Sequence, residues 1–140
     1  ARLAGLVGIA VTFVVFHTVL AGLQDLDGAA LVADTLFHTV VPLLAVGGWL
    51  LLGPRGLADR RAAALALVFP LLWGTFTLLR GPVADFYPYP FVDVRQLGYA
   101  RVLVNVALVG VLFYGLALGA AAADRRLPGL RVEEPSAPQV

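Results

Sequence analysis

Asp34 and His38 are the side chains of this sequence best suited to acid–base chemistry. They lie one helical turn apart within a segment, residues 29–53, that is otherwise apolar and long enough to cross a membrane. An aspartate in lipid costs about 2.5–3.5 kcal/mol on insertion scales, so it indicates a partner, a cavity or a substrate. At positions i and i+4 the carboxylate can fix the imidazole tautomer, as in the base and orienting acid of a catalytic triad. Contact between helices is the alternative role.

Further polar side chains are predicted at a similar depth. At 1.5 Å per residue, His38 lies about 22 Å from Gly53, within the outer third of a hydrocarbon core of about 30 Å. All four predicted spans bring polar groups to the outer half of the membrane. We therefore predict a polar cup in the bundle that opens outward. Its predicted catalytic residues are His38 and Asp34, and arginines could bind a substrate carboxylate. The predicted substrate-binding residues are His17, Thr39, Arg80, Arg101 and Asn105.

Metal or cofactor chemistry finds little support in the sequence. His17, Asp34 and His38 could supply three metal ligands, but their spacing matches no signature such as HExxH. The absence of cysteine removes thiolate catalysis and cysteine-based metal sites. Nucleotide and haem motifs are absent from the sequence. We therefore predict that the site uses no metal and no cofactor.

The elements that must position these residues are membrane spans. The chain has 140 residues, of which 60% are hydrophobic and 14% charged, as expected for an integral membrane protein. Scattered basic residues and a net charge of +1 argue against nucleic-acid binding. We predict an all-α, polytopic transmembrane helix bundle over residues 1–123, followed by a polar, disordered tail at 124–140. The four predicted spans are about 3–23, 29–53, 62–80 and 98–123.

Arginine placement predicts the orientation of the bundle. Arg55, Arg60 and Arg61 gather in the second loop, and more arginines follow the last span, whereas the first loop has none. The positive-inside rule then places the second loop and the C-terminus in the cytoplasm. We expect a multi-pass protein of the cell membrane with both ends cytoplasmic.

Three local motifs carry structural expectations. The segment FYPYPF, residues 86–91, is either an interfacial anchor or a rigid lid over the cup. Gly115 and Gly119 form a GxxxG pattern, which permits close approach of helices, and the bundle could associate with a second copy. Pro42 and Pro70 fall within spans and are expected to kink them.

The sequence also resembles a known family of multispan membrane proteins. The segments HTVVP (38–42) and YPYPF (87–91) resemble the androgen-induced-gene-one and androgen-dependent TFPI-regulating-protein family, and residues 38–56 are especially similar to its uncharacterised bacterial branch. The resemblance covers about residues 3–123. It implies a six-span fold, of which these four spans are the C-terminal part. It also implies a threonine hydrolase of fatty acyl esters, with His38 matching the family histidine and the nucleophilic threonine lying upstream.

Two functions follow as expectations. In the first, the protein is an intramembrane hydrolase of lipid esters in which His38 is the general base and Asp34 orients it. In the alternative, a non-enzymatic bundle binds lipid or carries protons through the same pair of residues. Membrane lipids are the expected partners in either case, and a fatty acyl ester is the expected substrate of the hydrolase.

Overall fold

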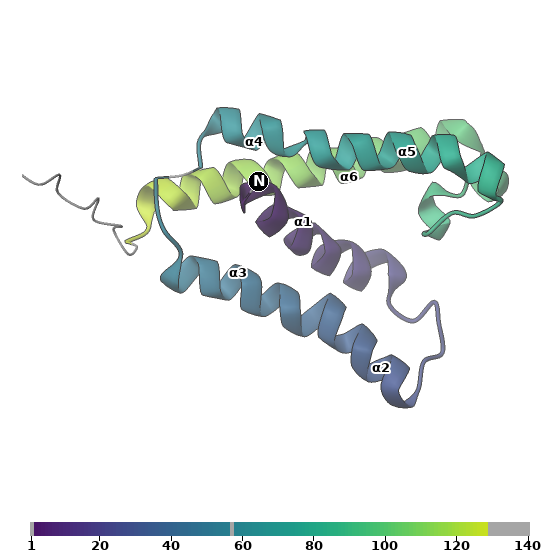
Figure 1. Cartoon of the computed structure of the whole chain (residues 1–140), viewed down its shortest axis with the longest axis horizontal. Helices are drawn as coiled ribbons and strands as arrows, with labels where there is room; N and C mark the ends of the chain where they lie inside the picture. The colour runs from purple at the N-terminus through teal and green to yellow at the C-terminus, as the bar shows by residue number, and fades with distance from the viewer. Residues whose placement is uncertain (1, 57, 129–140) are drawn as a thin grey trace, which may run out of the picture.

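The computed structural model describes residues 2–56 and 58–128, which form an all-helical bundle (Figure 1). Four helical stretches are long and apolar enough to span a membrane, which confirms the predicted fold class. The third and fourth stretches extend past their predicted boundaries. The last helix continues through Arg126, and residues 129–140 of the predicted tail lie outside the described part. The four stretches are Arg2–Leu20, Gly28–Leu52, Arg60–Ala84 and Val94–Arg126.

Three of the stretches are divided into shorter elements. Pro70 lacks the N–H that would bond the carbonyl of Ala66, and α4 ends at Ala66. The bounds are α1 (Arg2–Val15) and the π turn η1 (Phe16–Leu20); α2 (Gly28–Thr35), the π turn η2 (Leu36–Val40) and α3 (Val41–Leu52); α4 (Arg60–Ala66) and α5 (Val68–Ala84); and the 3-10 turn η3 (Pro90–Val92) before α6 (Val94–Arg126).

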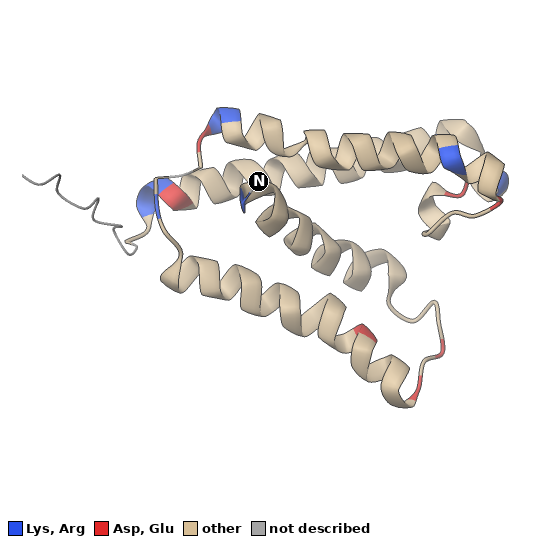
Figure 2. Cartoon of the chain, in the orientation of Figure 1, with Lys and Arg blue, Asp and Glu red and all other residues tan. Residues whose placement is uncertain are grey.

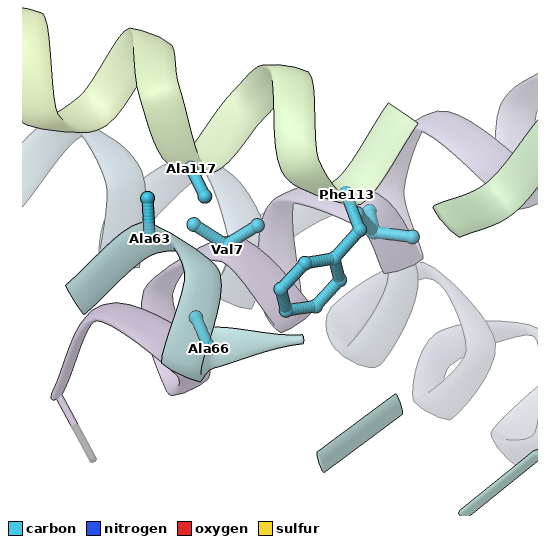
Figure 3. Packing of buried hydrophobic residues seen from close by; sticks show 6 residues of the cluster. Val7, Ala63, Ala66, Phe113 and Ala117 are labelled. Carbon is cyan, nitrogen blue, oxygen red and sulfur yellow. The ribbon is translucent and has the colours of Figure 1, made fainter. Parts of the chain in front are cut away.

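The main core lies where α1 meets α4 and α6. Val7 of α1 and Phe113 of α6 are buried there together with three alanines, as Figure 3 shows. Small side chains allow the helix backbones to approach closely, which is how membrane helices gain packing contacts where lipid supplies little hydrophobic drive. The alanines are Ala63, Ala66 and Ala117.

The GxxxG motif of α6 takes no part in this packing. A Cβ atom placed on Gly115 or Gly119 meets no other atom within 4 Å, whereas Phe113 and Ala117 face the core. Close helix contact within the described residues therefore uses alanine rather than this glycine pair. Association of two copies through the motif stays a prediction.

The stretch from α2 to α3 forms an arm that packs chiefly on α1. Figure 1 shows α2 directed away from α5, while α1 runs between the arm and the rest of the bundle. A second, smaller core holds the loop before α6, where Tyr87 and Val92 pack on Val102. The arm and this loop form two walls of the candidate site.

Candidate functional site

The predicted pair of Asp34 and His38 is in contact. Nδ1 of His38 lies 2.9 Å from Oδ1 of Asp34 and 3.1 Å from the Asp34 carbonyl oxygen. Both neighbours are acceptors, so Nδ1 carries the proton of a neutral imidazole and Nε2 keeps its lone pair. The side chain of His38 is 31% exposed and that of Asp34 is 22% exposed. The pair has the geometry of a base held in one tautomer by an acid.

Each of the two histidines lies in a π turn. In η1 the N–H of Ala21 bonds the carbonyl of Phe16 at 2.7 Å, and in η2 the N–H of Val41 bonds the carbonyl of Leu36. Each of these hydrogen bonds joins residues five apart in sequence, whereas the bonds of an α-helix join residues four apart. Such turns are rare and are found frequently at functional sites. Pro42 is the second residue after η2 and cannot donate to the carbonyl of His38, which favours a local departure from α-helix there.

The two π turns also contact each other. Oγ1 of Thr39 lies 3.2 Å from Nε2 of His17, and Nδ1 of His17 lies 2.9 Å from the carbonyl oxygen of Phe13. That carbonyl requires a proton on Nδ1 of neutral His17, so the Thr39 hydroxyl donates to Nε2. The ring of His38 stacks on Phe16, with centroids 4.3 Å apart and planes 6° from parallel. We call Phe16, His17, Asp34, His38 and Thr39 the histidine cluster.

A cavity of about 240 Å³ adjoins the histidine cluster. His38 forms part of its wall, and Trp73, Tyr89 and Phe91 form an aromatic wall elsewhere in the lining. Tyr89 stacks on Phe91 with ring centroids 5.4 Å apart, and Trp73 lies 6.0 Å from Tyr89. Two residues of the YPYPF segment thus line the cavity, which is the position expected of a lid rather than of an anchor alone.

Polar contacts hold this loop against the start of α6. Nδ2 of Asn105 donates to the carbonyl of Phe91 at 2.8 Å. Arg95 pairs with Asp93 at 2.9 Å and also with Asp85. Hydrogen bonds from Arg95 hold the pKa of the Asp93 carboxyl below its ordinary value, because they favour the ionised form. The loop is therefore tied at several points.

The predicted site residues fall into two groups. Asp34, His38, His17 and Thr39 come together in the histidine cluster. The others lie apart from it: Asn105 holds the loop, and Arg80 and Arg101 are exposed and do not line the cavity beside His38. Their role in substrate binding stays a prediction.

Sequence reasoning missed Phe16 and Trp73, whereas Tyr89 and Phe91 belong to the segment that was predicted as a lid or an anchor. A signal for Phe16 was available, because the tetrapeptide FHTV occurs twice, at residues 16–19 and 37–40, and both copies overlap a π turn. Trp73 had no comparable signal, because it lies in the middle of an apolar span and hydropathy does not tell which neighbours a side chain contacts. Among residues 2–56 and 58–128, no group of three or more His, Cys, Asp or Glu side chains is placed to hold a metal ion.

A function for this chain has to be argued from the geometry of the site, because the comparisons with known proteins found no match. The resemblance noted from the HTVVP and YPYPF segments stays a prediction. No protein-family model matches the chain, and no curated protein or solved structure matches it.

Proposed function

We propose that the protein is an intramembrane hydrolase of fatty acyl esters in which His38 is the general base. The observation that carries the proposal is the contact between Asp34 and His38 at the wall of an apolar cavity. Nε2 of His38 accepts the proton of the attacking hydroxyl, while Asp34 stabilises the imidazolium that forms. The same nitrogen then returns a proton to the alcohol that leaves, and the acyl group stays on the attacking oxygen. In a second round Nε2 accepts a proton from water, which attacks this acyl-enzyme and releases the fatty acid and the free hydroxyl.

The cavity suits the hydrocarbon part of such a substrate. It shares Gly8, Thr12 and Phe69 with a groove of about 1010 Å³ that follows α1 past α4 and α5. An acyl chain can extend from the cavity along this groove while its ester group lies beside His38. The lining is mainly apolar and aromatic, as is usual for sites that bind small hydrophobic ligands.

The nucleophile is a separate part of the proposal. Among the residues that the structure describes, no hydroxyl forms a hydrogen bond with Nε2 of His38. The family resemblance implies a threonine upstream of the matching segments, and we assign the attack to a hydroxyl of that kind.

Fluorophosphonate labelling, combined with hydrolysis of a fatty acyl ester in liposomes, tests the proposal. His38→Ala should lower hydrolysis about 10²–10⁴-fold, the usual contribution of a general base, and should abolish labelling. Asp34→Asn should lower hydrolysis while leaving the fold intact. Thr75→Val is the control, because Thr75 follows the HTVVP segment, is exposed on α5 and does not line the cavity. Unchanged hydrolysis in folded His38→Ala would overturn the assignment.

A proton-carrying bundle is the second candidate. It is favoured by the partial exposure of Asp34 and His38, and by the lack of a hydroxyl bonded to Nε2 of His38 within residues 2–56 and 58–128. A protein of this kind moves protons across liposomes in a manner that Asp34→Asn abolishes, and it cleaves no ester. Measuring flux and hydrolysis on the same preparations separates the two functions.

A further inference from the structure

A second pocket lies at the end of the bundle where the chain enters α4 and leaves α6. It has a volume of about 380 Å³ and shares no lining residue with the cavity at His38. The contributions from α6 recur at helical spacing, so they form one face of that helix. The lining residues are Arg60, Tyr114, Leu118, Ala121 and Arg125.

The two arginines of this pocket have no acidic partner within the described residues. Their neighbours in sequence are acidic, but both carboxylates are engaged elsewhere. Asp59 accepts from a backbone N–H in the first turn of α4 at 2.6 Å. Asp124 is buried and accepts from the N–H of Ala58 at 2.8 Å. Arg60 and Arg125 therefore bring two positive charges to one pocket. Figure 2 shows arginine at this end of both helices.

We propose that this pocket binds the phosphate group of an anionic phospholipid. Arg60 and Arg125 donate to the phosphate oxygens, because the planar guanidinium matches phosphate geometry. The Tyr114 hydroxyl is a further donor, and Leu118 offers apolar surface for the start of an acyl chain. Basic pockets between spans on the cytoplasmic side bind anionic headgroups, and the positive-inside rule predicts that side for this end.

The test compares two double variants that remove the same charge. Arg60→Gln with Arg125→Gln changes the pocket, whereas Arg61→Gln with Arg126→Gln changes the next residue on each helix, outside the pocket lining. Native mass spectrometry of the full chain in detergent measures binding of phosphatidylglycerol, with phosphatidylcholine as the neutral lipid. We expect the pocket variant to bind phosphatidylglycerol about tenfold more weakly than the control variant. Tyr114→Phe should weaken binding about fivefold, as expected for one hydrogen bond.

Several outcomes would overturn the proposal. Equal losses in the two double variants would indicate diffuse attraction to the surface rather than a pocket. Equal binding of phosphatidylglycerol and phosphatidylcholine to the wild type would exclude headgroup recognition. If inorganic phosphate binds the wild type as tightly as phosphatidylglycerol does, the ligand is free phosphate and not lipid. Thermal unfolding without added lipid controls for folding. If the pocket variant is unstable, Arg60→Lys with Arg125→Lys replaces it, because this variant keeps the charge and loses the planar guanidinium: weaker binding of phosphatidylglycerol supports the proposal, and unchanged binding overturns it.

Discussion

Replacing Thr39 with valine should weaken the attachment of the arm to η1, the turn that continues α1, while leaving the shape of η2 unchanged. The substitution removes the hydroxyl that donates to Nε2 of His17. Hydrogen bonds between membrane helices average about 0.6 kcal/mol and reach about 1.7 kcal/mol. The bond here is 3.2 Å long and exposed, so we expect a value near the average, about 0.6 kcal/mol.

Thr18 provides a matched control for this change. It occupies the corresponding position in the other copy of FHTV, but its hydroxyl donates to the carbonyl of Val14 in the same helix at 2.7 Å. That bond joins nothing across the bundle, and Thr18→Val should change the free energy of unfolding by close to zero. A double-mutant cycle of Thr39→Val with His17→Phe should give a coupling energy of about 0.6 kcal/mol.

Unfolding by steric trapping in bicelles measures these free energies for the wild type and each variant. If Thr39→Val and Thr18→Val destabilise the protein equally, or if the coupling with His17→Phe is zero, the contact does not join the arm to η1. The residues of the histidine cluster would then not form one unit.

Two further predictions concern the loop that lines the cavity. Gly81→Ala places a Cβ against the ring of Tyr87 and should destabilise the protein by about 1–3 kcal/mol, whereas Gly74→Ala on the same helix meets open space and should not, as unfolding measurements will check. Because the pKa of Asp93 is lowered by Arg95, their ion pair stabilises the fold at neutral pH and is lost as the pH falls below about 4. Asp93→Asn should therefore flatten the acid limb of a stability profile measured between about pH 3 and 7.

Apolar length alone predicted the four spans, because a membrane requires about 20 apolar residues whichever helices they later contact. The contact of Asp34 with His38 was also predictable, since i and i+4 fix the distance within one helix. The end of the third span was not. Gly81 and Pro82 suggest a break, yet α5 continues to Ala84, and the left-handed conformation of Asp85 ends it.

Contacts between helices lay beyond sequence reasoning. The arithmetic of rise per residue predicts how deep His17 lies, but it does not predict which way the side chain points. Each π turn adds one residue to a turn and so rotates the helix that follows by about 100°. Whether the side chains of His17 and Thr39 point toward each other depends on both rotations. A hydropathy pattern predicts neither rotation.

The arm also has a mechanical consequence. Val7, Ala63, Ala66, Phe113 and Ala117 form a core to which α2 and α3 contribute nothing, while the cavity takes His38 from the arm and its aromatic wall from elsewhere. A change in the tilt of the arm therefore widens or narrows the chamber without unpacking the core. Because the arm packs chiefly on α1, the angle between these helices sets where His38 lies in the cavity wall.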